Sequence, residues 1–254
     1  MNPEAPSIHL RDDWDRHWSE YAAAAERNPA QRFRRKVVLS CLALKKSAAL
    51  TRLLDIGSGQ GDFAAEVLEA YPAIEVLGLE LSSAGVEMAS RKVPAAQFLQ
   101  CDLAQSNQPA EHRMAWATHA VCSEVLEHVD DPETLLRHAR AWMAPGCRLV
   151  VTVPGGPMSA FDRHIGHRQH FRPEELARVL QRAGFVIERT GGAGWPFFNL
   201  YRRVVIARGR RLIDDVSREP SPVSRAAMGT FDALFHLNVQ SRGWQTFAVA
   251  TCPE

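Results

Sequence analysis

Three glycines at alternate positions follow a short apolar run in the first quarter of this chain. They are Gly57, Gly59 and Gly61, and the run that precedes them begins at Leu53 and carries Asp55 near its end. Helical spacing resumes after the last glycine, so the pattern predicts a buried parallel strand, a tight turn and the start of a helix. Glycine adopts positive φ and has no Cβ to obstruct a ligand. The turn therefore predicts a small-molecule site at the carboxyl end of a strand.

The glycine spacing separates this turn from the common nucleotide-binding motifs. The dinucleotide fingerprint needs its third glycine one position later, where this chain has Asp62. A carboxylate there also disfavours a pyrophosphate, because helix amino-termini attract anions. No Gly-Lys-Ser/Thr follows, as a P-loop would require. The stretch from Asp55 to Gly61 instead resembles motif I of the class I S-adenosylmethionine-dependent methyltransferases, whose cofactor carries a sulfonium cation and no phosphate.

Acidic residues end the next two predicted strands. Glu80 follows the predicted strand 74–79, and Asp102 follows the predicted strand 96–101. In the family that motif I resembles, the first acid accepts the ribose hydroxyls and the second suits the adenine amino group. The residues after them offer an apolar surface and a backbone N–H to the adenine ring. The resemblance thus implies adenosine contacts from Glu80, Leu81, Asp102 and Leu103.

The fourth predicted strand, 117–123, runs into Ser-Glu-Val-Leu-Glu-His-Val-Asp-Asp-Pro. This string is similar to the EVLEHVxDP signature of the small-molecule branch of the family. With a fifth strand at 148–153, the resemblance covers about residues 50–190 and extends to the ubiquinone-pathway O-methyltransferases. It implies S-adenosylmethionine as cofactor. The implied cofactor-binding residues are Tyr21, Asp55, Gly57, Ser58, Gly59, Gly61, Glu80, Leu81, Asp102, Leu103 and Ser123.

Strands and helices alternate regularly through the middle of the chain. Helices are expected near 61–71, 82–91 and 131–143, with the last two strands at 185–190 and 244–252. This order predicts an α/β fold, a doubly wound Rossmann-like sheet of seven mostly parallel strands with the last antiparallel. We expect one domain over 1–254, divided into an N-terminal helical cover (12–48), a cofactor-binding core (50–190), a helical insert or lid (191–242) and the last strand (243–254).

The insert between the last two strands is too long to be structureless in a compact domain. We expect two helices in it, over 196–213 and 223–237. The apolar side of the first is expected to hold Phe197, Tyr201, Val204, Val205 and Leu212. This helix also carries five arginines, at positions 202, 203, 208, 210 and 211. They either solubilise the helix or contact an anionic membrane, a lipid-like acceptor or a phosphate-bearing acceptor. A homodimer contact is a further hypothesis for the helix pair.

Methyl transfer from a sulfonium requires the acceptor to be held in line with the methyl carbon, at about 3 Å. An oxygen acceptor must also lose its proton, and an imidazole with an unperturbed pKa of ~6.5 is a suitable base. His128 directly follows the fourth strand, and His167 lies in the loop after the fifth. These two are the catalytic candidates, and their presence slightly favours oxygen over nitrogen or carbon as the acceptor atom.

The loop after the fifth strand holds three histidines at intervals of three: His164, His167 and His170. This spacing raises the question of a metal, but zinc sites seldom use it without a distant ligand, so we expect no metal site. The segment is similar to the GHxxHF-x-P-E-x-L stretch of many small-molecule methyltransferases, where it borders the substrate pocket. The candidate acceptor contacts are His164, His170, Trp195 and Tyr201.

Composition excludes several classes. A net charge of +1 gives no broad grip on nucleic acid, and the Asp/Asn-Pro-Pro-aromatic motif of base-amino methyltransferases is missing after the fourth strand. Cys122 is not preceded by proline, as a cytosine-C5 enzyme would require. Five scattered cysteines disfavour disulfides, and no apolar run could span a bilayer, so we expect a cytoplasmic protein.

Three function hypotheses remain from the sequence. The leading one is an enzyme that methylates a small-molecule or lipophilic metabolite. An NAD-linked oxidoreductase is disfavoured by the glycine spacing. A non-catalytic subunit or scaffold that binds S-adenosylmethionine and engages a partner through its basic insert is the main alternative.

Overall fold

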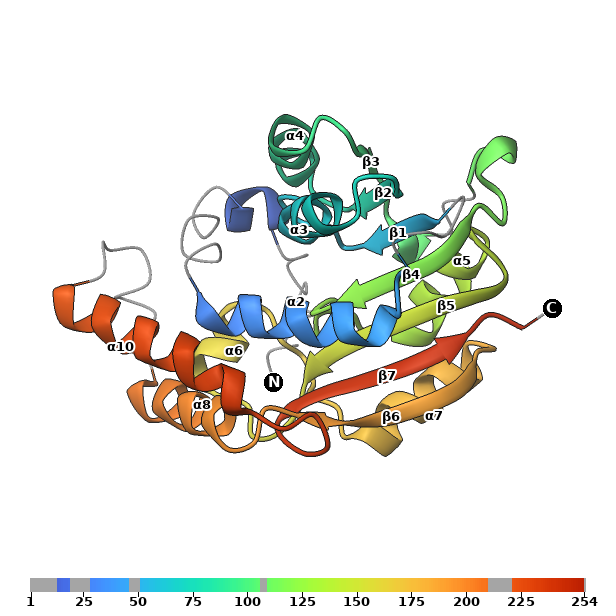
Figure 1. The fold of residues 1–254 in the computed structure, drawn as a ribbon. Helices are drawn as coiled ribbons and strands as arrows, with labels where there is room; N and C mark the ends of the chain where they lie inside the picture. Colours follow the sequence, from blue (N-terminus) through green and yellow to red (C-terminus); the bar gives the residue numbers. More distant parts are fainter. Residues whose placement is uncertain (1–12, 19–27, 46–50, 106–108, 210–220, 254) are drawn as a thin grey trace, which may run out of the picture.

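A computed structural model describes residues 13–18, 28–45, 51–105, 109–209 and 221–253. Within these residues, seven strands form one sheet in the order β3-β2-β1-β4-β5-β7-β6 (Figure 1). The strands are β1 (Arg52–Ile56), β2 (Glu75–Glu80), β3 (Gln97–Gln100), β4 (Ala117–Ser123), β5 (Met143–Pro154), β6 (Val186–Ala193) and β7 (Gln245–Thr251).

Strand direction follows the expected pattern. The β1–β2, β1–β4, β2–β3 and β4–β5 pairs are parallel, whereas β7 is antiparallel to both β5 and β6. The predicted seven-stranded sheet with an antiparallel last strand is therefore confirmed. Because β1 lies between β2 and β4, the chain reverses its direction of winding at β1. In such sheets ligands bind beyond the carboxyl ends of the strands at this reversal.

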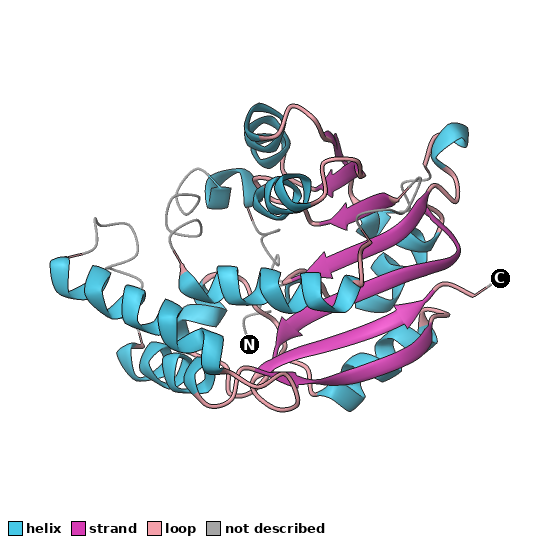
Figure 2. Ribbon diagram, in the orientation of Figure 1, coloured by secondary structure: helices cyan, strands magenta, loops and turns pink. Residues whose placement is uncertain are grey.

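Helices cover both faces of the sheet (Figure 2). α5 and α7 pack on one face, and α2, α3 and α4 on the other. In Figure 1 the arrowheads of the parallel strands point toward the side where α6, α8 and α10 lie. The helices are α2 (Pro29–Leu42), α3 (Asp62–Ala70), α4 (Ser83–Lys92), α5 (Pro132–Arg140), α6 (Ala160–His164), α7 (Pro173–Arg182), α8 (Phe197–Arg208) and α10 (Pro222–Leu234).

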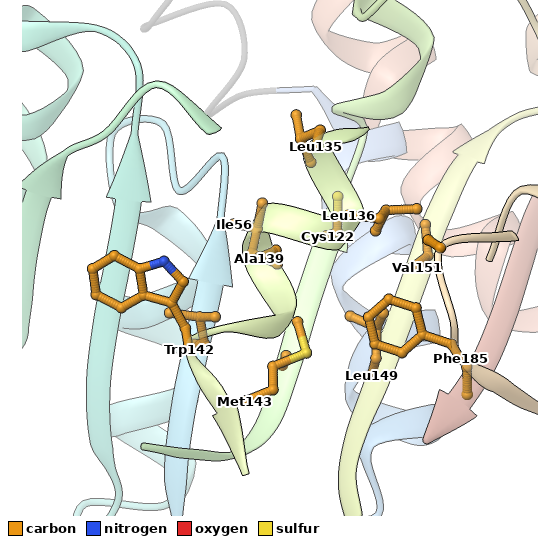
Figure 3. Packing of buried hydrophobic residues seen from close by; sticks show 14 of the residues in the cluster. Ile56, Cys122, Leu135, Leu136, Ala139, Trp142, Met143, Leu149, Val151 and Phe185 are labelled. Carbon is orange, nitrogen blue, oxygen red and sulfur yellow. The ribbon is translucent and has the colours of Figure 1, made fainter. Parts of the chain in front are cut away.

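The core on the α5 side shows how the sheet is held (Figure 3). Leu136 of α5 packs toward Val151 of β5, in the same buried cluster as Ile56 of β1, and all three side chains are at most 1% exposed. Near-continuous apolar runs in the central strands follow from burial on both faces. This core fixes the parallel strands, and so aligns their carboxyl ends at one edge.

Two predicted boundaries in this region are wrong. The helix expected over 131–143 ends at Arg140, because Met143 already pairs with Ala117 as the first residue of β5. β6 continues to Ala193, beyond the expected end at residue 190, because residues 191–193 pair with 245–247 of β7. The two consecutive glycines at 191 and 192 therefore lie within the strand.

The predicted apolar side of the insert's first helix is confirmed for Phe197 and Tyr201, which pack against the core, and for Val205, which is buried. It is wrong for Val204, which is 42% exposed. The prediction missed Phe198, which is buried and packs against Phe33 of α2 with ring centroids 5.0 Å apart. Leu212 and the arginines at 210 and 211 lie outside the described residues.

Two further expectations concern cysteines and membranes. All five cysteines lie within the described residues, where each is buried and outside any disulfide. Among the described helices, none combines the length and the apolar character needed to cross a bilayer.

Candidate functional site

The glycine loop, residues 57–61, turns sharply between β1 and α3 and is bonded to the end of β2. The amides of Gly57 and Ser58 donate to the Leu79 carbonyl at 2.8 and 3.2 Å. Gly61, with φ +82°, provides the N-cap of α3 in a left-handed conformation. The loop is thereby fixed beside the residue that follows Leu79, which is Glu80.

Glu80 joins the glycine loop to the start of α4. One carboxylate oxygen accepts from the Gly59 amide at 2.8 Å and the other from the Ser82 amide at 2.9 Å. Burial raises the pKa of Glu80, and these backbone bonds act against that rise. Gly59 has φ +54°, and a Cβ there would lie 2.5 Å from the ring of Trp18. Only glycine fits both the backbone and the space at this position.

Asp55 is a buried acid of this region that lacks a full set of hydrogen-bond partners. It is 3% exposed, and its Oδ2 has no hydrogen-bond partner. Burial, together with the nearby charge of Glu80, raises the pKa of Asp55 to about 7. A buried polar atom without a partner is costly, so a ligand that donates a hydrogen bond or carries positive charge would be stabilised here. The two carboxylates, Asp55 and Glu80, fit the amino-acid end and the ribose of a nucleoside thioether better than they fit a phosphate.

Other predicted cofactor residues occupy varied positions. The Ser58 hydroxyl faces Gly78 under the loop, where a Cβ on Gly78 would be 2.6 Å from it. Asp102 caps its own turn by accepting from the Ala104 amide at 3.0 Å. Leu81 is 40% exposed, as an open apolar surface for a base requires. Leu103 is buried, the Ser123 hydroxyl bonds that of Thr152 at 2.8 Å, and Tyr21 lies outside the described residues.

A helical turn over residues 14–18 covers this edge of the sheet. Asp15 accepts from the Ser82 hydroxyl at 2.6 Å and from the Ala84 amide at 3.0 Å, which ties the turn to the start of α4. Trp18 lies over Gly59, and Trp14 packs edge-on against His128 at 4.7 Å between ring centroids. This part of the predicted N-terminal cover contacts both the glycine loop and the first catalytic candidate.

The second part of the site is the histidine cluster, formed by Glu127, His128, His167 and His170. The loop that carries His167 docks on the turn after β4, because the Arg168 amide donates to the Glu127 carbonyl at 2.8 Å. The rings of His128 and His167 then meet edge-on at 4.7 Å. Both catalytic candidates predicted from the sequence are therefore neighbours in space.

Burial dominates the electrostatics of this cluster. It raises the pKa of Glu127 well above its usual range, with the charge of Glu124 adding to the rise. It lowers the pKa of His128 to about 3 and that of His167 to about 2, with neighbouring histidines contributing. Both histidines are therefore neutral at neutral pH, the form in which an imidazole accepts a proton. Both carboxyl oxygens of Glu127 are buried without a partner.

Asp162 and Arg202 form a buried ion pair beside the cluster. The two guanidinium nitrogens lie 3.1 and 2.7 Å from the two carboxylate oxygens. Burial acts to raise the pKa of Asp162, but the Arg202 hydrogen bonds and charge place it well below its usual range. Arg202 therefore does not solubilise the helix, which was one hypothesis for its five arginines, since the residue is 7% exposed. The Ser159–Asp162 capping box was a readable signal for Asp162, but nothing local predicted its partner.

Sequence reasoning also missed a contact behind the cluster. Glu124, the residue after β4, adopts φ +58° and accepts from Arg34 of α2 at 2.9 Å. Its second oxygen accepts from the Gln245 amide at 2.7 Å. These two contacts hold a strained backbone at the point where β4 enters the site.

Of the predicted acceptor contacts, His170 joins the cluster through a ring contact with His167. His164 is exposed on α6. Trp195 is 39% exposed, with the Arg242 guanidinium 5.4 Å from its ring. Tyr201 donates to the Asn28 side chain at 3.1 Å within an aromatic group on α8 and α10.

The histidine cluster brings together side-chain atoms of the kind that bind metal ions. Those of Glu127, His128 and His167 lie within 4.8 Å of one another, as do those of Asp162, His167 and His170. Asp162 has both oxygens on Arg202, and Nδ1 of His167 is engaged by His170. The expectation that the chain has no metal site stays a prediction.

Comparison with known proteins gives three consistent matches. A family model described as a methyltransferase domain matches residues 20–190. The chain is 28% identical to trans-aconitate 2-methyltransferase of Methylobacterium nodulans, over 67% of this chain and 62% of that protein. It is 24% identical to ubiquinone biosynthesis O-methyltransferase of Chromobacterium violaceum, over 74% and 84%.

Among solved structures, phosphoethanolamine N-methyltransferase 2 of Haemonchus contortus in complex with S-adenosyl-L-methionine has the same fold. The TM-score is 0.63 at 17% identity, over 94% of this chain and 57% of that one. The chain thus spans less than two thirds of the length of this structure and of the Methylobacterium relative.

Proposed function

This chain belongs to the methyltransferase-domain family, and from that premise we propose that it transfers a methyl group from S-adenosylmethionine to an oxygen atom of a small-molecule acceptor. The observation that carries the proposal is the juxtaposition of two sites at one sheet edge. The glycine loop with Glu80 suits a nucleoside. The histidine cluster, bridged to it by the turn over residues 14–18, supplies proton acceptors.

The residues of the first site match the parts of the cofactor. Glu80 would accept hydrogen bonds from the ribose hydroxyls. The unpartnered Asp55 oxygen would accept a hydrogen bond from a donor group of the cofactor. Leu81 offers its exposed side chain to the adenine. The bound cofactor supplies an electrophilic methyl group on sulfur. The remaining task of the protein is to hold the acceptor in line with it and to take up the acceptor's proton.

His167 is the stronger candidate for that proton. Its imidazole is neutral, and one ring nitrogen is held by His170 while the ring as a whole stays next to Glu127. A weak base suffices, because an oxygen that has gained a methyl group becomes strongly acidic before it releases its proton. His128 packs against His167 under Trp14 and would line the acceptor site.

The names of the relatives support an acceptor of this kind. Trans-aconitate 2-methyltransferase and ubiquinone biosynthesis O-methyltransferase indicate by name a carboxylic acid and a quinone precursor as substrates. An acidic or phenolic hydroxyl compound is therefore the first class to test on this chain.

The cofactor half is tested by calorimetric titration of S-adenosylhomocysteine. We expect Glu80→Ala to weaken binding by about tenfold or more, since hydrogen bonds to a charged group contribute about 1.5–3 kcal/mol. Glu75→Ala, at the exposed amino end of the same strand, is the matched control and should bind like the parent. Equal affinity of the Glu80→Ala protein would contradict the placement of the nucleoside.

The acceptor half is tested by transfer of labelled methyl groups to a panel of carboxylic acids, phenols and amines. We expect turnover on an oxygen acceptor. With a phenol we expect a fall of about a hundredfold in His167→Ala, whereas a carboxylic acid is already ionised at neutral pH and has no proton to transfer. Tight cofactor binding without transfer to any acceptor would instead favour the scaffold alternative. Transfer to amines alone would overturn the choice of oxygen.

A further inference from the structure

His170 is the member of the histidine cluster to which the proposed reaction gives no task. Its side chain is 7% exposed, and it lies at the rim of an open hollow of about 590 Å³ bordered by Gly156, Phe171 and Arg172. Both of its ring nitrogens are engaged. Nδ1 lies 3.0 Å from the Gly156 carbonyl oxygen, and Nε2 lies 3.1 Å from Nδ1 of His167.

The Gly156 carbonyl decides which nitrogen of His170 carries the proton. A carbonyl oxygen can only accept, so Nδ1 of His170 must donate. Burial lowers the pKa of His170, so its ring is neutral near pH 7 and its Nε2 has a free lone pair. Asp162 does not compete for a proton on Nε2. It lies 3.8 Å away, beyond hydrogen-bonding distance, and its nearer oxygen already accepts from Arg202 and the Ser159 amide at 2.7 Å each.

The proton position on His170 also decides which nitrogen of His167 is protonated. Because Nε2 of His170 accepts, Nδ1 of His167 must be the donor across the 3.1 Å contact. The reverse direction would require both nitrogens of His170 to be protonated. A neutral His167 with its proton on Nδ1 has its lone pair on Nε2. That nitrogen lies 4.0 Å from the buried Glu127 carboxyl group.

Resting on the proposed methyl transfer, we propose that His170 is a positioning residue that fixes the Nδ1–H tautomer of His167, so that Nε2 of His167 is the atom that receives the acceptor's proton. As the acceptor oxygen bonds to the methyl carbon, the electron pair of the broken carbon–sulfur bond stays on sulfur. The proton of that oxygen then moves to Nε2 of His167.

The ionised Asp162 completes the arrangement. One of its carboxylate oxygens lies within 4.8 Å of a ring nitrogen of His167 and of a ring nitrogen of His170. Its negative charge acts to raise the pKa of His167 and so favours the imidazolium that forms on proton transfer. Arg202 orients that carboxylate without bonding either histidine ring among the contacts of the described residues. The chain Gly156–His170–His167 thus selects the base nitrogen by hydrogen-bond direction.

Two replacements of His170 separate positioning from mere packing. In His170→Gln, a side-chain amide can donate to the Gly156 carbonyl and accept from Nδ1 of His167, as the imidazole does. In His170→Leu, neither bond is possible, although the volume is similar. His112→Leu, at an exposed histidine in the short turn Glu111–Arg113, is the matched control.

The first readout is the ring-nitrogen spectrum of ¹⁵N-histidine-labelled protein, with the signals of His167 assigned from a His167→Gln variant. We expect Nδ1 of His167 to be protonated in the parent and in His170→Gln, and the Nε2–H form to gain population in His170→Leu. A parent protein in which His167 carries its proton on Nε2 overturns the proposal, whether or not any acceptor is methylated.

The second readout is turnover, compared with affinity for S-adenosylhomocysteine. We expect His170→Leu to lower kcat by about tenfold to a hundredfold at unchanged cofactor affinity. His170→Gln and His112→Leu should stay within about threefold of the parent. Equal losses in the Gln and Leu variants would refute the assignment. If no acceptor is methylated, the proposed function fails, but the parent spectrum and that of His170→Gln still decide the tautomer. They also decide it if His170→Leu does not fold.

Discussion

The glycine loop and the histidine cluster lie at the same sheet edge but are built in different ways. Backbone amides hold the first: Gly59 and Ser82 bind Glu80, and Leu79 binds the loop. Side chains hold the second, and they come from α6, α8 and the loops after β4 and β5. A site made from backbone groups depends on local conformation, whereas a site made from side chains depends on segments brought together by the whole fold.

The difference extends to charge. In and around the glycine loop, the Glu80 carboxylate has a backbone donor on each oxygen, whereas Oδ2 of Asp55 and the Ser58 hydroxyl have no hydrogen-bond partner. In the histidine cluster, Glu127 has two unpartnered oxygens and His128 an unpartnered Nδ1. The first region is ready for a ligand of defined shape. The second contains buried polar groups without hydrogen-bond partners, an arrangement that is common in active sites.

The largest effect should come from breaking the side-chain support of the cluster. Arg202→Met leaves the Asp162 carboxylate buried without its partner, which we expect to lower the free energy of unfolding by about 3–5 kcal/mol. Urea denaturation measures the loss. Arg203→Met, the adjacent residue on the exposed side of α8, should change stability by about 1 kcal/mol or less. Similar losses in both variants would contradict a special role for the buried pair.

A second test concerns the charge stored beside the glycine loop. The pKa of Asp55 is about 7 when folded, against about 4 when unfolded, so the folded protein holds this proton more tightly. The stability it contributes is present below pH 4 and is lost as pH rises toward 7, by at most about 4 kcal/mol.

Asp55→Asn removes that dependence. The variant should gain stability relative to the parent between pH 5 and pH 8 in urea denaturation. Asp102→Asn, whose carboxylate is partly exposed and hydrogen-bonded, is the control. A parallel pH profile for the parent and Asp55→Asn would show that Asp55 ionises normally.

A third test separates backbone from side-chain effects in the glycine loop. Gly59→Ala forces a left-handed backbone on a residue with a Cβ, at a cost of about 1–2 kcal/mol, and brings that Cβ against Trp18. We expect weaker binding of S-adenosylhomocysteine and lower stability. Combining it with Trp18→Ala should recover the steric part only. Full recovery in the double variant would mean that the backbone conformation is unimportant.

The smallest effect should come from the link between the two regions. Asp15→Ala removes the acceptor for Ser82 and Ala84, exposed contacts that contribute about 1 kcal/mol or less. Cofactor affinity should fall by less than about fivefold, because the turn over residues 14–18 keeps its aromatic contacts. Glu87→Ala on α4 is the control. A large loss would show that the turn is a principal part of the binding site.

Local sequence signals were sufficient to predict the glycine loop and the position of Glu80 beside it. The glycine spacing, the apolar strands and the acid at position 80 each concern neighbours along the chain or the end of an adjacent parallel strand. The sheet and the Gly59–Glu80 contact were therefore predictable. The sequence also indicated His128 and His167, since both follow strands whose carboxyl ends share an edge.

Only the tertiary structure decided how the histidine cluster and the ion pair beside it are organised. Residues 162 and 202 are far apart in the chain, and an arginine on an amphipathic helix reads as solvent-exposed until its partner is known. The face that α8 buries, the depth at which Glu127 lies and the proton direction from Gly156 to His167 all depend on packing between distant segments. Periodicity reports which residues share a side of one element, but burial and hydrogen-bond direction are set by what the fold places opposite.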